Sequence, residues 1–215
     1  MIGAYGQWAA DGVLGEGPAE LSFRQGKWDS LESWRAAARQ RALECLAPVN
    51  LGGVPQVTVE SEGAHDGLHV EKLSWQLPMG PRTEAVFLKP EGARGPLPAI
   101  LALHDHAGNK FLGWRKIVRA DASPWAIQLS HWERYYGGLA WANGAARRGY
   151  AVLVHDTFPF ASRRVRVADL PPQVQYGGVD PEPSDLEGIR KYNEFAAQHE
   201  HIVAKSLFCA GTTWP

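Results

Sequence analysis

The fold class is indicated by one stretch that passes from an apolar run into a polar, glycine-containing turn, Ala99-Ile100-Leu101-Ala102-Leu103-His104-Asp105-His106-Ala107-Gly108-Asn109-Lys110. The apolar part does not alternate with polar residues, which is typical of a strand covered on both faces. A second run of this kind covers residues 150–154. Residues 137–148, between the two runs, have the length and alanine content of a crossover helix. A strand, a crossover helix and a parallel strand form a right-handed unit, so the pattern predicts an α/β fold.

Strand and helix signals continue on both sides of this unit. Residues 70–77 alternate in part, residues 83–88 are apolar at most positions, and the turn Pro78-Met79-Gly80-Pro81 separates them. We expect two adjacent antiparallel strands there. A last helix is predicted over about residues 184–207, because apolar side chains recur at helical spacing. These are Leu186, Ile189, Tyr192 or Asn193, and Ala196.

The amino-terminal region carries a weaker pattern. The first 28 residues are glycine-rich without sustained periodicity, which predicts an irregular lead segment. Asp29 and Glu32 then have the spacing of a capping box, and an amphipathic helix is predicted to end near Pro48. We therefore divide the chain into residues 1–49, an irregular lead segment plus an amphipathic helix, and residues 50–215, an α/β region.

Composition excludes several classes of protein. The 215 residues contain 22 Lys and Arg against 23 Asp and Glu, so no basic surface is expected for a nucleic acid. No apolar run approaches the roughly 20 residues that span a bilayer, and the start lacks the pattern of a secretory signal. We expect a cytoplasmic protein that binds no membrane. Cys45 and Cys209 show no metal or disulfide spacing and are expected to be buried free thiols.

The turn that follows the first apolar run carries the clearest chemical signal. Ligands of open α/β sheets bind outside the carboxyl ends of the strands, so this turn and the segment His155-Asp156 are predicted to face one crevice. A tight turn containing Gly108 can present backbone N–H groups to a developing oxyanion. His106 would donate such a bond through its backbone.

Other interpretations of these residues stay open. His104 and His106 could be polar residues at a strand end whose imidazoles bond to the backbone. They could also bind a metal, with His199-Glu200-His201 as a second pair, although positions i and i+2 of a helix point apart. Asp156 could line the crevice or cap the following turn. The arginines beyond it could hold an acidic substrate group or belong to a solvated loop: Arg163, Arg164 and Arg166.

The order of these elements resembles the amino-terminal half of an α/β-hydrolase. The resemblance covers the antiparallel strand pair, the strand at 99–103, the turn that follows it, the helix, the next strand and the segment from Asp156 to Arg164. Within that superfamily the chain is most similar to the dienelactone hydrolase and acetyl xylan esterase-like group, over roughly residues 50–215. The turn of that group is usually His-Gly-x-x-Gly; His104 and Gly108 match it, and Asp105 replaces the first glycine.

The resemblance implies an α/β-hydrolase fold, with a mostly parallel sheet and flanking helices, and hydrolysis of carboxylic esters of the acetyl-ester or lactone type. His106 would contribute a backbone N–H to the oxyanion hole, and His104 and Gly108 would shape the turn. Asp156 and Phe158 would line the substrate crevice. The resemblance implies no cofactor and no metal, and its substrate would be a small-molecule ester.

The same resemblance places a nucleophilic serine on a G-x-S-x-G elbow, followed by an acid and a histidine. No serine of this chain has glycines at that spacing, and the chain ends before the strand that would carry the elbow. We therefore expect an incomplete α/β-hydrolase domain that is inactive as an isolated chain. An exposed apolar sheet edge should then cause self-association or bind a partner chain. The alternatives are a non-catalytic α/β module that pairs with a second polypeptide, and a metal-dependent hydrolase using His104 and His106.

Overall fold

The computed structural model describes residues 4–14, 17–50 and 52–213. Its helices and strands follow in this order: α1 (Ala4–Leu14), α2 (Leu31–Leu46), β1 (Val57–His65), β2 (Leu68–Trp75), β3 (Thr83–Pro90), β4 (Ala99–Ala102), α3 (Ala126–Tyr136), α4 (Trp141–Arg147), β5 (Ala151–His155) and α5 (Leu186–Cys209). Short 3-10 helices connect some of them, including η2 (Trp114–Lys116) and η3 (Ala161–Arg163).

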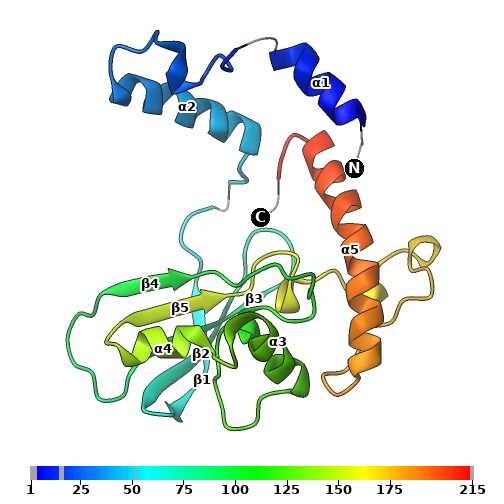
Figure 1. The fold of residues 1–215 in the computed structure, drawn as a ribbon. Helices are drawn as coiled ribbons and strands as arrows, with labels where there is room; N and C mark the ends of the chain where they lie inside the picture. Colours follow the sequence, from blue (N-terminus) through cyan, green and yellow to red (C-terminus); the bar gives the residue numbers. More distant parts are fainter. Residues whose placement is uncertain (1–3, 15–16, 51, 214–215) are drawn as a thin grey trace.

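The strands of the described residues form one five-stranded sheet in the order β1-β2-β3-β5-β4 (Figure 1). β4 and β5 pair in parallel, with Ile100 opposite Val152, which confirms the predicted α/β unit. The remaining pairs are antiparallel. The sheet is therefore mixed, where a mostly parallel one was expected. Short turns join β1 to β2 and β2 to β3, and such connections can only join antiparallel neighbours.

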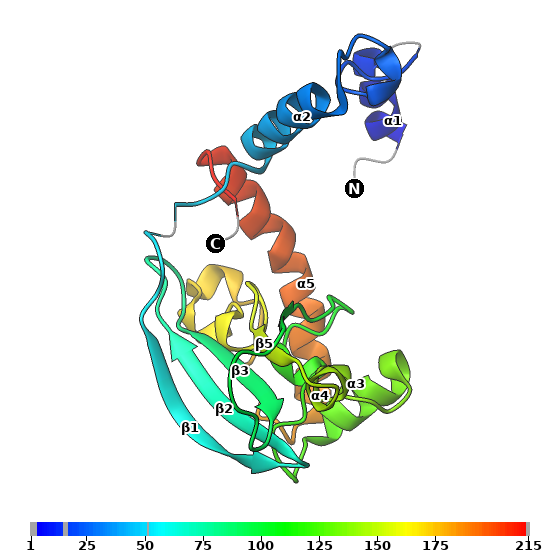
Figure 2. The same ribbon diagram turned by 90° about the vertical axis from the view of Figure 1, so that its left-hand side faces the viewer.

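One face of the sheet is packed against helices. Figure 2 shows α3, α4 and α5 on the same side of the sheet. The core on this side combines strand residues with the segment after β4 and with α4, and includes Val86, Ile117 and Ala142. The connection from β4 to β5 contains two helices, where one was predicted over residues 137–148. The reason is Gly137, which has a φ of 59° and ends α3 in the left-handed region.

The opposite face and one edge of the sheet are open. β4 is an edge strand, and Leu101 and Leu103, at its carboxyl end, are 63% and 60% exposed. In Figure 2 no helix of the described residues lies against this face. The apolar edge was expected, whereas β4 is not covered on both faces as its unbroken apolar run suggested.

The amino-terminal helices stand away from the sheet in Figures 1 and 2. α1 corrects the expectation that the lead segment is irregular throughout. α2 confirms the predicted helix, but Ser30 and Ser33 form its capping box in place of Asp29 and Glu32. No side chain of α2 is fully buried; Trp34, on the expected apolar face, packs against Phe23 and donates to the carbonyl oxygen of Leu21.

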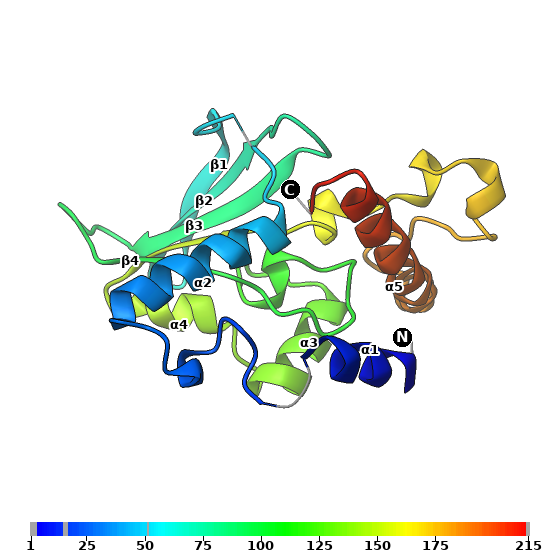
Figure 3. The same cartoon turned by 90° about the horizontal axis from the view of Figure 1, so that it is seen from above.

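The predicted last helix is confirmed as α5. Its residues Ile189, Tyr192 and Ala196 are buried, whereas Leu186 is exposed. Seen from above, α5 lies at the end of the sheet where β4 and β5 finish, together with residues 160–185 (Figure 3). Within the described ranges, no helix has the length and apolar character to cross a membrane. The two cysteines are exposed free thiols, and the expectation that they are buried is wrong.

Candidate functional site

The turn after β4 contacts three other segments through three consecutive side chains, of which His104 is the first. Its Nε2 accepts hydrogen bonds from the backbone N–H and the hydroxyl of Thr157, at 3.2 and 3.1 Å. Its Nδ1 donates to the carbonyl oxygen of Asp105 at 3.1 Å. Burial, together with the nearby Lys116 ammonium, lowers the pKa of His104 to about 4. The imidazole is therefore neutral at pH 7 and ties the turn to the segment after β5.

Asp105 joins the turn to α3. Its Oδ2 accepts hydrogen bonds from the Tyr136 hydroxyl at 2.6 Å and from Nε2 of His131 at 3.2 Å. Burial acts to raise the pKa of Asp105, but these donors and the Lys116 ammonium outweigh burial and lower it. The other carboxylate oxygen, Oδ1, is buried without a hydrogen-bond partner in the described structure. Asp105 thus keeps its charge and holds α3 against the turn.

His106 joins the turn to α5. Its Nε2 lies 3.2 Å from both carboxylate oxygens of Glu200, which also accepts a hydrogen bond of 2.8 Å from Nζ of Lys110. Nδ1 of His106 accepts the N–H of Gly108 at 3.1 Å, and Nε2 also lies 2.8 Å from Nζ of Lys110. Burial acts to raise the pKa of Glu200, but the hydrogen bonds with Lys110 and His106 lower it. Glu200 is therefore the charged anchor of the turn on α5.

A second residue of α5 binds the backbone of the turn. Oδ1 of Asn193 accepts the N–H groups of Lys110 at 2.8 Å and of Phe111 at 3.1 Å. Its Nδ2 donates to Oδ1 of Asn109 at 3.2 Å. Asn193 and Glu200 are seven residues apart, two turns of helix, so they lie on one face of α5. That face fixes the carboxyl-terminal half of the turn.

Two buried lysines approach the same aromatic ring beneath the turn. Lys110 and Lys116 have no exposed surface, and their Nζ atoms lie 4.1 and 4.2 Å from the ring centroid of Phe160. Nζ of Lys116 donates to the carbonyl oxygens of Asp105 at 2.6 Å and of His106 at 3.0 Å. Burial lowers the pKa of Lys116 to about 7, although the Asp105 carboxylate acts to raise it.

The turn presents two consecutive backbone donors that are not used within the described chain. The N–H groups of His106 and Ala107 have no hydrogen-bond partner among the described residues, whereas those of Gly108 and Asn109 are bonded locally. Ala107 and Gly108 have φ values of 37° and 68°, and successive amides in such turns form anion-binding concavities. Ala107 and Gly108 also line a cavity of about 170 Å³ between the turn and α3.

Asp156 is a fully buried carboxylate that binds two neighbouring segments of the chain. It has no exposed surface, and its carboxylate accepts the backbone N–H of Trp114 at 2.7 Å and the N–H and hydroxyl of Ser162 at 3.0 and 2.7 Å. Burial raises its pKa in spite of these donors. A Cβ at Gly113 would lie 1.9 Å from Oδ1 of Asp156, so the chain passes too close for a side chain. Of the two roles considered for Asp156, this geometry corresponds to capping the turn.

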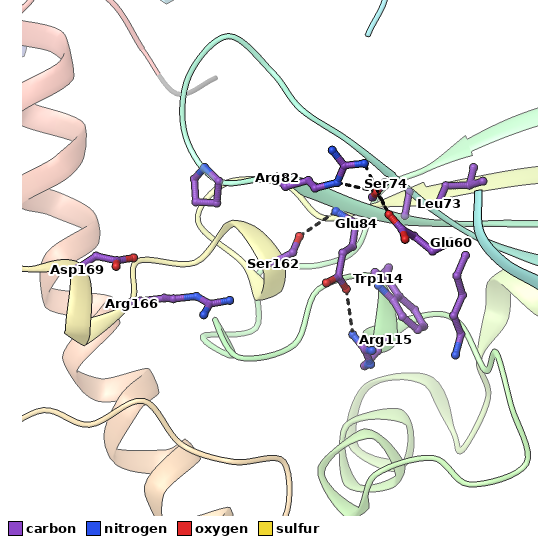
Figure 4. A pocket seen from close by; sticks show the side chains of 13 residues that line it. Glu60, Leu73, Ser74, Arg82, Glu84, Trp114, Arg115, Ser162, Arg166 and Asp169 are labelled. Carbon is purple, nitrogen blue, oxygen red and sulfur yellow. Dashed lines mark hydrogen bonds and ion pairs between the residues drawn. The ribbon is translucent and has the colours of Figure 1, made fainter. Parts of the chain in front are cut away.

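A larger cavity of about 560 Å³ lies at the same end of the sheet, beside η2 and η3 (Figure 4). Figure 4 shows Arg115 and Arg166 on either side of the Glu84 carboxylate, and Glu84 lies 3.9 Å from Arg115. Trp114 is one of the residues that line the cavity. Its indole Nε1 is itself buried and has no hydrogen-bond partner in the described structure. The cavity is of the size that binds small molecules and offers both donors and acceptors.

The structure brings together some of the predicted site residues and separates others. His104, His106 and Gly108 lie in one turn, and His104 contacts Thr157 in the segment after β5. Phe158 is half-buried beside the Arg163 guanidinium, 5.8 Å from its ring centroid. Sequence reasoning gave no role to the side chain of Lys110 within the turn or to the residues that reach the turn from elsewhere: Lys116, His131, Tyr136, Asn193 and Glu200.

The imidazoles of the turn do not converge on a metal site. His104 uses both nitrogens within the protein, and His106 faces Lys110 and Glu200. Over the described part of the chain, no three His, Cys, Asp or Glu side chains are grouped as metal ligands.

Comparison with known proteins identifies the fold. No protein-family model matches the sequence, and no curated protein matches it significantly. Among solved structures, the chain is similar to a Bacteroides fragilis protein assigned as an acetyl xylan esterase, with a TM-score of 0.54 and 17% identity, over 99% of this chain and 46% of that one. It is also similar to a glucuronoyl esterase from Solibacter usitatus, with a TM-score of 0.44 and 19% identity, over 87% of this chain and 53% of that one.

The chain thus spans about half the length of the structures that it matches. The first similarity, together with the strand order and the parallel β4–β5 pair, shows that the chain has a fold of the α/β-hydrolase type.

Proposed function

We propose that this chain supplies the oxyanion-binding part of a carboxylic ester hydrolase. The observation that carries the proposal is the pair of unused N–H groups at His106 and Ala107, on a turn fixed from three sides. When a nucleophile attacks an ester carbonyl, its oxygen becomes negatively charged, and prepositioned backbone donors stabilise that charge. The fold agrees, since the similar B. fragilis protein is assigned as an esterase.

The nucleophilic serine, its acid and its base histidine lie outside this chain in the proposal. No serine of the sequence stands in a G-x-S-x-G elbow, and Ser162 in η3 is bonded to Asp156 and to the backbone of Glu84. The serine oxygen would attack the carbonyl carbon while the histidine takes its proton, and the N–H of His106 would bind the oxyanion. The histidine would then return the proton to the departing alcohol. No metal or cofactor is needed.

The substrate in this proposal is a small ester of the acetyl or lactone type. The cavity of about 170 Å³ that Ala107 and Gly108 line lies next to the turn and provides room for a small acyl group. Its lining includes the polar side chains of Ser130, His131 and Asn193, which suits a polar substrate rather than a long acyl chain.

Covalent labelling tests the proposal. We expect the recombinant 215-residue chain to give an unmodified mass near 23.6 kDa after treatment with a fluorophosphonate, and to hydrolyse no activated acetyl ester. The protein isolated from cells that express its own gene should give an adduct on a serine outside these residues. Labelling or turnover by the 215-residue chain would contradict the proposal, because it would place the nucleophile within the chain.

A second candidate function is a non-catalytic module that pairs with another polypeptide. It is favoured by the open edge at β4, where Leu101 and Leu103 are exposed. If this second function is correct, sedimentation equilibrium of the chain mixed with its native partner should show a complex of defined mass, and that complex should bind no fluorophosphonate. A defined complex that does bind the probe supports the esterase.

A further inference from the structure

Lys116 is one of two fully buried lysines beside the proposed oxyanion site. Its side chain has no exposed surface, and burying an ammonium group is costly unless its hydrogen bonds are replaced. Here they are replaced by two consecutive backbone carbonyls, those of Asp105 and His106, and by the face of Phe160 at 4.2 Å. The buried charge is therefore directed at the backbone of the turn itself.

The two carbonyls determine where the neighbouring amides point. A trans peptide unit is planar, and its C=O and N–H point in opposite directions. The carbonyl of Asp105 shares its plane with the N–H of His106, and the carbonyl of His106 shares its plane with the N–H of Ala107. Because Lys116 binds both carbonyls, both N–H groups face away from it, and neither has a hydrogen-bond partner among the described residues.

We propose that Lys116 is a positioning residue for the oxyanion site: by binding two consecutive carbonyl oxygens, it aims the N–H groups of His106 and Ala107 at one anionic oxygen. This inference rests on the proposed function and assigns the orientation of its donors to one side chain. Lys116 itself touches no substrate.

Lys110 provides a matched comparison within the same site. It is equally buried and lies 4.1 Å from the same ring, but its Nζ contacts two side chains, Glu200 and His106, each at 2.8 Å, instead of backbone carbonyls. Removing either lysine takes one positive charge from the site. Only the removal of Lys116 frees the two peptide units to rotate.

The test uses acetate as a small carboxylate probe and acetamide as its neutral control, followed by ¹H–¹⁵N NMR of the 215-residue chain. We expect acetate, but not acetamide, to shift the amide resonances of His106 and Ala107 in a saturable way. Lys116→Met should weaken this binding about tenfold, the effect of losing one oriented hydrogen bond to a charged group. Lys110→Met should weaken it by less than about threefold, through the loss of a charge and of a side-chain contact with His106 that leaves the two carbonyls bound to Lys116.

The outcomes separate the two proposals. If acetate does not shift these amides in the wild-type chain, the oxyanion site is contradicted and the role of Lys116 with it. If acetate binds the wild type and Lys116→Met equally well, or if Lys110→Met loses as much as Lys116→Met, the role of Lys116 alone is overturned.

A second measurement applies if Lys116→Met does not fold. In a pH titration of the wild-type chain, the amide shifts of His106 and Ala107 should follow the ionisation of the Lys116 ammonium, observed at its own Nζ, because the neutral amine holds the carbonyls less strongly. The other groups facing this ammonium are followed in the same titration: Asp105, Lys110, His104, His106, His131 and Asp156. Lys116→Arg keeps the donors and should abolish this response. If the amide shifts of His106 and Ala107 do not follow the ionisation of Lys116, the proposal is overturned.

Discussion

At the scale of single residues, the site is a set of polar groups that are buried and paired one by one. His104, Asp105 and His106 are adjacent in sequence, yet each binds a different part of the fold. A polar side chain buried with its partner restricts the backbone around it, because a lost partner leaves a desolvated group behind. The free amides at His106 and Ala107 are held in place by this arrangement.

His104 makes the stability of this chain depend on pH. The pKa of His104 is lowered to about 4 in the fold, from 6.5 for a free histidine, so the unfolded chain binds a proton between these values and the folded chain does not. The stabilisation is present above pH 6.5 and is lost as the pH falls to about 4, by up to ~3 kcal/mol. His104→Gln keeps an acceptor for Thr157. The free energy of unfolding, measured with urea, should therefore depend less on pH between 6.5 and about 4 in this variant than in the wild type. His201→Gln, on an exposed residue of α5, is the control and should leave the slope unchanged; equal slopes in wild type and His104→Gln would refute the assignment.

At the scale of elements, α5 is the support of the turn. Asn193 satisfies two backbone N–H groups and Glu200 binds two side chains. The apolar residues between them, such as Ala196, pack the helix in place. The orientation of the turn thus depends on a helix whose contacting residues lie 82 to 94 positions further along the chain.

We expect Asn193→Ala to loosen this support. The N–H groups of Lys110 and Phe111 would lose their acceptor, which should destabilise the chain by ~3 kcal/mol in urea unfolding. Hydrogen exchange at these two amides should rise by more than the loss of global stability explains. The matched control is Gln198→Ala on the exposed side of α5, with an effect within about 0.5 kcal/mol. Unchanged protection of Lys110 and Phe111 in Asn193→Ala would show that α5 does not hold the turn.

Sequence patterns predicted the elements whose apolar residues form an unbroken run or a regular spacing and missed those that show neither. β5 and β4 stand out as unbroken apolar runs, and α5 has a clear apolar spacing. β1 is exposed at almost every position, so it shows no alternation. α3 buries Gln128 and His131 beside Trp132, which hides its apolar face. From the sequence alone, Lys116 and Glu200 would be expected to be exposed charges, because their partners are brought to them only by the tertiary fold.

At the scale of the whole molecule, the open edge of the sheet decides how the chain behaves in solution. β4 exposes unpaired backbone groups and the side chains of Leu101 and Leu103. Strands of this kind pair with other chains unless a charge, a proline or a covering element prevents it. β4 contains no charged residue, and no helix of the described chain covers its outer side. We therefore propose that the isolated chain associates with itself through this edge, or with a partner that covers it.

Leu101→Lys tests this proposal, because a charge on an edge strand opposes pairing with a second chain. Sedimentation velocity of the variant should show mostly monomer at concentrations where the wild type is associated. Leu139→Lys is the matched control, since Leu139 is 66% exposed but precedes α4, away from the β4 edge, and it should associate as the wild type does. If both variants associate like the wild type, another surface is responsible. If the native partner prevents association of the wild type, and Leu101→Lys no longer binds that partner, the edge that causes self-association is also the surface on which the rest of the proposed hydrolase is assembled.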